Sequence, residues 1–237
     1  MIKIPGIETY YGGKSGSGVY QTIINHIPAH QIYIEPFLGG GGIMRIKRPA
    51  PQYNIGCELD WNIVQLWHLS KKKHNVIVHH KNALDFLEDN CSNTVYTDLG
   101  RDVFIYADPP YLLESRKSNR KRYRHEMSIE DHKRLLSILS RLPFNVAISC
   151  YENILYTQYL PGWRKITFQA ATRRGNATEV LYMNYPEPER LHDYKFIGSD
   201  FRERERIRQK VKRHVNGLLK LPVHERNAII DAISCRF

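Results

Sequence analysis

Short apolar runs alternate with helical patterns through most of the chain, and this alternation restricts the fold more than any other feature. The runs that read as strands are 32–38, 53–58, 76–79, 103–107 and 145–149. The segments with helical spacing between them are 59–69, 83–88 and the stretch from Ser128 to Pro143. Strands separated by helices pair in parallel, because the chain must cross back over the sheet. The pattern therefore predicts an α/β fold.

Local signals fix the ends of some of these elements. Ser128 can cap a helix whose N3 residue is Asp131, and an apolar face follows at Leu135, Leu136 and Leu139. Pro143 ends that helix, since proline lacks the backbone N–H that a helix interior needs. The remaining expected elements are a short helix at 154–160 and an antiparallel pair formed by 163–168 and 180–184.

The composition changes at Pro186 and Pro188, so we expect an α/β body at 1–185 and a basic helical tail at 186–237. In the tail, apolar residues recur at intervals of three and four, at Ile207, Val211, Val215 and Leu218. This spacing indicates one apolar helical stripe with a basic opposite face. A solvated face with pairs to Glu203 and Glu205 is the alternative. A second tail helix is expected at 223–233.

The chain has 35 Lys and Arg against 24 Asp and Glu, so 35 − 24 gives a net charge of +11. Such a surplus favours a polyanionic partner, because counterion release and long-range attraction both act on nucleic acid. The charge is concentrated in two clusters, with six basic residues at 114–126 and seven at 201–214. The first cluster lacks apolar periodicity and is expected to form a loop or hairpin.

Several function classes fit the sequence poorly. No apolar run approaches the roughly 18 residues that a membrane span needs, and the segment 1–6 lacks the apolar stretch of a secretory signal, so we expect a cytoplasmic protein without a membrane. The cysteines lie far apart, at 57, 91, 150 and 235, which favours reduced thiols. Neither they nor the histidines show ligand spacing, so we expect no metal.

A run of glycines follows the first expected strand, after Glu35, Pro36 and Phe37. The residues 39–42 are all glycine, which permits positive φ and close approach of a nucleotide-like ligand to the backbone. The spacing differs from a dinucleotide fingerprint, because Met44 occupies the third glycine position, and no phosphate-loop lysine follows. A flexible turn is the alternative interpretation.

An acidic residue at the end of the next strand supports the ligand interpretation. Asp60 stands about twenty residues beyond the glycines, where a carboxylate can accept hydrogen bonds from ribose hydroxyls. Glu58 points the same way along an alternating strand and competes for this role. Asp60 can instead cap the helix that begins at Trp61.

The most distinctive segment is Asp108-Pro109-Pro110-Tyr111, directly after the strand 103–107. Each proline fixes its own φ and restricts the residue before it, so the turn is rigid. Such a turn directs the Asp108 carboxylate and the Pro109 carbonyl into one small volume beside the Tyr111 ring. Two acceptors next to an aromatic face suit the exocyclic amino group of a base.

The order of these motifs resembles the DNA adenine-N6 methyltransferases of the Dam type, the D12 class with its Asp-Pro-Pro-Tyr motif. The resemblance covers nearly the whole chain, and its motifs are 10–14 (YYGGK), 35–37 (EPF), 60–62 (DWN) and 108–111 (DPPY). Downstream stretches are also similar to short bacterial and phage members, at 126–127, His132, 148–151 and 178–181. The resemblance implies a class I, Rossmann-like sheet of seven strands and S-adenosylmethionine as cofactor.

The resemblance also implies roles for individual residues. The implied cofactor contacts are Tyr10, Lys14, Glu35, Phe37, Gly39, Gly40, Gly41, Asp60 and Asp108. The implied catalytic motif is Asp108, Pro109, Pro110 and Tyr111, with Asp108 bridging cofactor and base. The acid that contacts the cofactor adenine is either replaced by Asn82 or supplied by Asp85, and we favour Asp85.

The 65 residues between Gly42 and Asp108 leave little room for the target-recognition insertion of this family. We therefore expect the basic segment 112–126 to grip double-stranded DNA, with short or relaxed sequence specificity. The residues expected to contact DNA are Arg116, Lys117, Arg120, Lys121, Arg122, Arg124, Arg173 and Arg174.

Three other functions remain open on the same scaffold. They are methylation of RNA adenine, methylation of cytosine N4, and DNA binding without catalysis. Cytosine enzymes of this pattern often have Ser at the position of Asp108, so the aspartate favours adenine. An intact acid beside Tyr111 argues against loss of activity.

Overall fold

The structure is a computed structural model that describes residues 12–70, 75–91, 95–116, 123–172 and 175–236. The described residues form a seven-stranded sheet in the order β3-β2-β1-β4-β5-β7-β6. Its strands are β1 (Ile32–Glu35), β2 (Tyr53–Glu58), β3 (Val76–His80), β4 (Val103–Ala107), β5 (Asn145–Cys150), β6 (Arg164–Thr172) and β7 (Gly175–Met183). This arrangement confirms the α/β fold and the seven strands that the resemblance implies.

The first five strands are parallel, and β7 and β6 close the sheet as an antiparallel hairpin. From β1 the chain runs outward through β2 and β3, then returns to β4 on the other side of β1. The strand order therefore reverses between β1 and β4, and ligands of open α/β sheets bind outside the carboxyl ends of strands at such a reversal. Both candidate motifs follow these two central strands.

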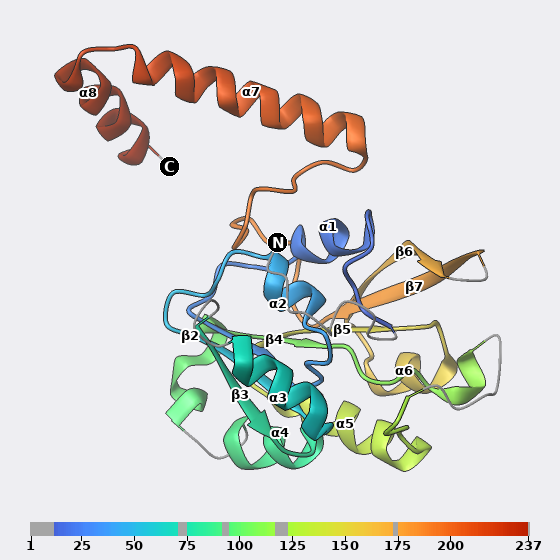
Figure 1. Cartoon of the computed structure of the whole chain (residues 1–237). Coiled ribbons are helices and arrows are strands. Elements are labelled where there is room, and N and C mark those ends of the chain that lie inside the picture. Colours follow the sequence, from blue (N-terminus) through green and yellow to red (C-terminus); the bar gives the residue numbers. More distant parts are fainter. Residues whose placement is uncertain (1–11, 71–74, 92–94, 117–122, 173–174, 237) are drawn as a thin grey trace. The chain divides into compact units, whose positions relative to one another are not determined.

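The helices of the body are α1 (Val19–Ile24), α2 (Gly42–Ile46), α3 (Trp61–Ser70), α4 (Ala83–Cys91), α5 (Ile129–Arg141) and α6 (Ile154–Tyr159), with 3₁₀ turns η2 (Val95–Asp102) and η3 (Leu113–Ser115). The helices α4, α5 and α6 pack against the main apolar cluster of the sheet, whereas α1 and α2 lie on the opposite side (Figure 1). The expected cap of α5 is confirmed, because the Ser128 hydroxyl accepts a hydrogen bond from the Asp131 N–H at 3.0 Å.

Element boundaries differ from the sequence predictions where prolines and glycines intervene. The expected strand 32–38 ends at Glu35, because Pro36 cannot donate to a ladder and the glycine turn follows. The closing hairpin is longer than predicted and includes residues 164–183. The helices α1 and α2 were not predicted, since both begin at glycine caps, Gly18 and Gly41, and contain only six and five residues.

The described chain divides into two compact units, residues 1–193 and 194–237. The first unit includes a segment after Pro186 that packs on the body. There Leu191 bridges to Pro28, and the Asp193 carboxylate accepts a hydrogen bond from the Arg48 N–H at 2.9 Å. The predicted transition at 185 therefore lies within chain that still belongs to the first unit.

The second unit consists of α7 (Phe201–Leu219) and α8 (Val223–Ser234). Asp200 caps α7 by accepting a hydrogen bond from the Glu203 N–H at 2.8 Å. Neither helix contains a buried residue. Among the described residues, no helix combines the length and the apolar character that crossing a membrane requires.

Candidate active site

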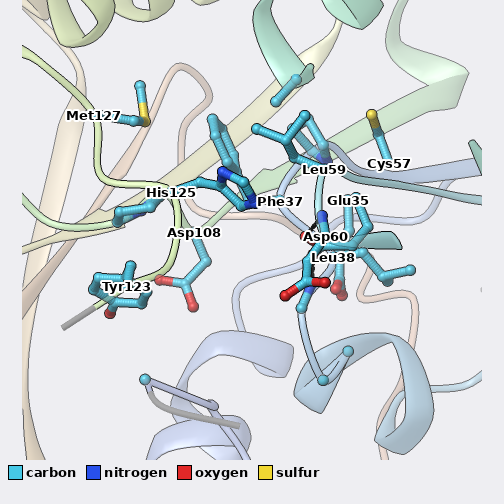
Figure 2. Close-up of a pocket in the computed structure, with 18 of the residues that line it drawn as sticks. Glu35, Phe37, Leu38, Cys57, Leu59, Asp60, Asp108, Tyr123, His125 and Met127 are labelled. Carbon is cyan, nitrogen blue, oxygen red and sulfur yellow. Dashed lines mark hydrogen bonds between the residues drawn. The ribbon is translucent and has the colours of Figure 1, made fainter. Parts of the chain in front are cut away.

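A cavity of about 210 Å³ opens at the carboxyl ends of β1, β2 and β4. Its lining includes the four glycines 39–42, Phe37, Asp60, Asp108 and Pro110. Asp60 and Asp108 enter the cavity from the ends of β2 and β4, with Phe37 between them (Figure 2). The structure therefore brings together the glycine segment, the acid after β2 and the turn after β4, as the switch point of an α/β sheet requires.

Packing within the protein explains two of the four glycines. Gly41 has φ +57°, and a Cβ at this position would overlap the ring of Trp67. The Trp67 Nε1–H donates a hydrogen bond to the Gly39 carbonyl at 2.9 Å, which holds the ring against the loop. A Cβ on Gly42 would lie 3.1 Å from the Lys14 backbone. The loop is thus shaped by α3 and the N-terminal segment as well as being open to the cavity.

The two acids at the end of β2 have different partners. The buried Glu58 carboxylate accepts hydrogen bonds from the Gly39 N–H at 2.7 Å and the Asp60 N–H at 2.8 Å. Burial raises the pKa of Glu58, although these backbone donors oppose the shift. Glu58 therefore fixes the glycine loop. Asp60 caps α3 through the Asn62 N–H at 3.0 Å and also lines the cavity, so its two proposed roles are compatible.

Asp85 is not brought to the cavity. Its carboxylate lies on α4 and pairs with Arg134 at 2.9 Å, with 49% of the side chain exposed. Asn82, Ala83 and Leu84 line the cavity instead, and the Asn82 side chain accepts a hydrogen bond from the Leu84 N–H at 2.8 Å. Of the two residues considered for the contact with the cofactor adenine, Asn82 lines the cavity and Asp85 does not.

Asp108 uses its two carboxylate oxygens unequally. Oδ1 accepts a hydrogen bond from the Ser149 hydroxyl at 2.8 Å and lies 2.9 Å from the Lys14 Nζ. The Ser149 hydroxyl in turn lies 2.9 Å from the Tyr106 hydroxyl. Within the described part of the chain, Oδ2 has no hydrogen-bond partner. Asp108 therefore offers one unsatisfied acceptor at the cavity.

Lys14 lies between two carboxylates. Its Nζ is 2.9 Å from Asp108 and 3.7 Å from Glu179, and only 6% of its side chain is exposed. Burial alone lowers the pKa of Lys14, but the neighbouring carboxylates of Asp108 and Glu179 reverse this effect and raise it above its ordinary value. The Lys14 ammonium therefore remains charged between Asp108 and Glu179.

Glu179 has a position in the site that the sequence did not indicate. It lies on β7, is 5% exposed, and accepts a hydrogen bond from the Tyr111 hydroxyl at 2.7 Å. The Tyr111 ring is itself buried and packs edge-on against Tyr151, with centroids 4.7 Å apart. The sequence does contain one sign of this role, because Glu179 stands directly before the apolar residues of an expected strand. An acid at such a position is expected to be buried, and a buried carboxylate needs hydrogen-bond or ionic partners.

Glu35 is the third buried acid near the cavity. It accepts a hydrogen bond from the Tyr33 hydroxyl at 2.6 Å and lines the cavity wall. Burial raises the pKa of Glu35 to about 8, although the Tyr33 hydrogen bond and the nearby Lys47 oppose the shift. Glu35 can therefore change its protonation near neutral pH.

The described part of the basic segment 112–126 makes contacts within the protein. Arg116 is 8% exposed, donates to the Tyr111 carbonyl at 2.7 Å and pairs with Glu126 at 2.8 Å. Arg116 therefore anchors the start of this segment to the Asp108–Tyr111 turn, and its side chain is buried. Arg124 is 62% exposed and pairs with Asp60 at 2.9 Å. The other predicted contacts lie outside the described residues: Tyr10, Lys117, Arg120, Lys121, Arg122, Arg173 and Arg174.

Among the described residues, no group of three or more His, Cys, Asp or Glu side chains is arranged to hold a metal ion. The rings of Tyr123 and His125 line the same cavity as Asp108 (Figure 2). The arrangement thus combines a glycine loop, two acids that reach the cavity, and aromatic side chains, which suits a nucleotide-like ligand beside an amino-bearing ring.

Residues 65–173 match the family of D12 class N6 adenine-specific DNA methyltransferases. The match includes the Asp108 turn and begins after the glycine loop and Asp60. It confirms over this segment the resemblance identified in the sequence. A search of curated proteins finds no match.

Three solved structures illustrate the similarity of fold. TrmN from Thermus thermophilus is 14% identical, with a TM-score of 0.46 over 69% of this chain and 46% of that one. The O-methyltransferase from Bacillus cereus in complex with SAH is 12% identical, with a TM-score of 0.45 over 70% and 79%. The putative methyltransferase yhhF from Escherichia coli is 16% identical, with a TM-score of 0.43 over 75% and 97%.

Proposed function

We propose that this chain, whose residues 65–173 match the D12 class methyltransferase family, transfers a methyl group from S-adenosylmethionine to the N6 atom of adenine in double-stranded DNA. The observation that carries the proposal is the asymmetry of Asp108. One oxygen is occupied by Lys14 and Ser149, and the other has no partner in the described chain and lies at the cavity. That oxygen can accept an N–H from an exocyclic amine.

The cavity fits the methyl donor in its chemistry. Gly39 and its neighbours leave backbone accessible, Asp60 offers a carboxylate to ribose hydroxyls, and Phe37 presents an apolar ring. S-adenosylmethionine, when bound, supplies a methyl group on a positively charged sulfonium. Glu35, Phe37, Asp60 and Asp108 are the side chains that would surround it.

The protein's contribution to the reaction is electrostatic. The lone pair of adenine N6 is delocalised into the ring and is a weak nucleophile. A hydrogen bond from N6–H to Asp108 Oδ2 and a second to the Pro109 carbonyl draw the amino group towards tetrahedral geometry. The Asp108 carboxylate, which Lys14 and Ser149 hold in place, stabilises the positive charge that develops on N6.

A flipped-out base is required because N6 is enclosed in the stacked duplex. The Tyr111 ring is buried and its hydroxyl is bonded to Glu179, so it supports the turn from behind. Tyr123 and His125 line the cavity in front of Asp108, and stacking on these rings offsets part of the cost of extrusion. We therefore assign the base-stacking role to Tyr123 and His125 in place of Tyr111.

The proposal is tested by incubating the protein with methyl-labelled S-adenosylmethionine and four matched substrates. These are a mixed-sequence DNA duplex, a DNA duplex of G·C pairs only, the RNA duplex of the mixed sequence, and its single DNA strand. Nucleoside analysis should find N6-methyladenine in the mixed DNA duplex and no label in the G·C duplex. Label confined to RNA, label in N4-methylcytosine, or donor binding without transfer to any substrate would each reject the proposal.

A further inference from the structure

Helix α7 and its C-cap residue Lys220 together carry more than half of the chain's net positive charge. Residues 201–220 contain eight Lys and Arg and two Glu, so 8 − 2 gives +6 of the total of +11. No residue of α7 is buried. This charge therefore stands in solvent.

The basic residues of α7 are ordered on the helix surface. Arg202, Arg206, Lys210 and Arg213 follow one another at intervals of four, four and three, so they lie along one face. We call these four residues the basic ridge. With a rise of about 1.5 Å per residue, the ridge is about 16 Å long. The apolar residues Ile207, Val211, Val215 and Leu218 lie on the opposite face, as their spacing predicts.

Ion pairs neutralise only the first turns of α7. Arg206 lies 3.5 Å from Glu203, and Arg208 lies 2.7 Å from Glu205. Arg202, Lys210 and Arg213 are exposed and have no hydrogen bond or ion pair within the described chain. The alternative of a solvated face held by glutamate pairs therefore accounts for the start of the helix. It leaves three of the four ridge residues without an acidic partner in the described chain.

The opposite face of α7 does not suit a membrane surface. Arg204 and Arg208 share the spacing of Val211 and Val215, at intervals of four, three and four, so two cations interrupt the apolar stripe. An apolar face buried among lipid chains would have to desolvate these guanidinium groups. The ridge itself offers several positive charges in a line and no apolar side chain, which is complementary to a row of phosphates.

We propose that the basic ridge of α7 is a second DNA-binding surface, which holds duplex phosphates without reading sequence. The inference rests on the proposed function for the identity of the polyanion. It also adds a surface to the contacts predicted in the body. The two predicted DNA contacts that the structure describes, Arg116 and Arg124, are already paired with Glu126 and Asp60.

Two full-length variants with equal net charge test the ridge. The ridge variant is Arg202→Gln, Lys210→Gln and Arg213→Gln, and the control variant is Arg204→Gln, Arg208→Gln and Lys212→Gln. Each removes three positive charges from α7. The equilibrium constant K for binding of each protein to a DNA duplex several helical turns long is measured at a series of salt concentrations. Far-ultraviolet circular dichroism verifies that both variants keep their helices.

We expect the slope of log K against log salt to fall in magnitude by about 2 to 3 in the ridge variant, since each phosphate contact contributes about 0.9. The control variant should change the slope by less than half as much. Equal slope changes in the two variants would overturn the proposal, because net charge alone would explain them, and so would an unchanged slope in the ridge variant.

Further measurements separate this inference from the proposed function. At saturating DNA, the methyl-transfer rate of the ridge variant should equal that of the wild type, because the ridge does not line the cavity. An unchanged salt slope with active methyl transfer rejects the ridge alone. Absence of methyl transfer in the wild type, with the slope difference intact, rejects the proposed function alone. Loss of binding to anionic phosphatidylserine vesicles in the ridge variant, with equal DNA slopes, would assign α7 to membranes and overturn the proposal.

Discussion

Two cations beside the candidate site, Lys14 and Arg116, and the cations of α7 are placed in opposite ways. In the first unit, Lys14 and Arg116 are 6% and 8% exposed, and each contacts carboxylates. On α7, the ridge residues Arg202, Lys210 and Arg213 are exposed and lack such partners within the described chain. Both regions add to the same net charge. A basic composition alone does not identify a polyanionic binding partner. Only those cations that have no acidic partner within the fold are free to bind one.

The two placements have different physical consequences. A buried ion pair cannot lose one member without leaving the other uncompensated, so substitutions there have large effects that salt screens weakly. An exposed cation is hydrated in any case and acts at a distance, so its contribution depends on salt. Substitutions in the cavity should therefore change the reaction, and substitutions on the ridge should change only binding.

The largest effect is expected for Asp108→Asn. Asparagine keeps the shape of the side chain but removes the negative charge that stabilises N6 in the transition state. The single-turnover methyl-transfer rate should fall by about 10² to 10³, the usual result of losing one preorganised electrostatic partner. Donor affinity, measured by calorimetry, should change much less. A rate loss below tenfold would contradict the role of Asp108 and remove the contrast with the ridge variant.

The acid stability of the first unit should depend on His132. Burial lowers the pKa of His132 from 6.5 to about 4, so the folded state holds it neutral. The unfolded state takes up a proton at this residue near pH 6.5, whereas the folded state does so only near pH 4. The contribution of the neutral His132 to the free energy of unfolding is therefore fully present above pH 6.5 and is lost as pH falls towards 4. The amount at stake is about 3 kcal/mol. In urea unfolding between these pH values, His132→Gln should flatten the decline of the unfolding free energy.

The matched control is His214→Gln, since His214 is exposed on α7. This variant should follow the wild-type stability at every pH. If both variants lose the same pH dependence, or if neither does, the burial of His132 is not the cause of the acid sensitivity of the first unit.

A smaller effect is expected for Glu179→Gln. The amide oxygen can still accept the Tyr111 hydrogen bond, but the carboxylate that lies 3.7 Å from the Lys14 Nζ is lost. We expect the methyl-transfer rate to fall by about tenfold, which corresponds to about 1.4 kcal/mol in the barrier, with little change in donor affinity. Tyr111→Phe removes the hydrogen bond and keeps the charges, so it should cost less. A larger loss in Tyr111→Phe than in Glu179→Gln would show that Glu179 acts only through the tyrosine.

The centre of the sheet was predictable because β1, β4 and β5 are buried on both faces and read as continuous apolar runs. β2 and β4 begin and end where their patterns predicted. The short helices α1 and α2 were not predictable, because each begins at a glycine with positive φ, which ordinarily signals the end of a helix or a turn. Their stability comes from tertiary packing, which local propensity does not encode.

The site was predictable where one segment carries the chemistry. The Asp108 turn and Asp60 each follow a strand directly, so the fold alone brings them to one edge of the sheet. The pairings were not predictable, since Lys14 and Asp108 are 94 residues apart and Tyr111 and Glu179 are 68 apart. Asn82 precedes α4 and faces the cavity, whereas Asp85 already lies in the first turn and pairs with Arg134.

The smallest effect is expected for Arg124→Gln. This residue tests the comparison between buried, paired cations and exposed, unpaired ones, because it is exposed and paired at the same time. Arg124 is 62% exposed, like a ridge residue, but it pairs with Asp60 at the cavity. If Asp60 accepts ribose hydroxyls, this pair competes with the donor. Exposed pairs contribute up to about 1 kcal/mol, so the variant should bind S-adenosylmethionine up to about fivefold more tightly.

Salt distinguishes this competition from a direct contact between Arg124 and the donor. Raising salt should screen the pair and tighten donor binding to the wild type, while binding to Arg124→Gln should not respond. Arg134→Gln is the matched control, because the partners of Arg134 are Asp85 and Glu88, neither of which lines the cavity. Weaker donor binding in Arg124→Gln would mean that the guanidinium contacts the donor itself. In that case Arg124 would resemble the buried cations Lys14 and Arg116. Its contact at the cavity, and not its exposure to solvent, would determine the effect of the substitution.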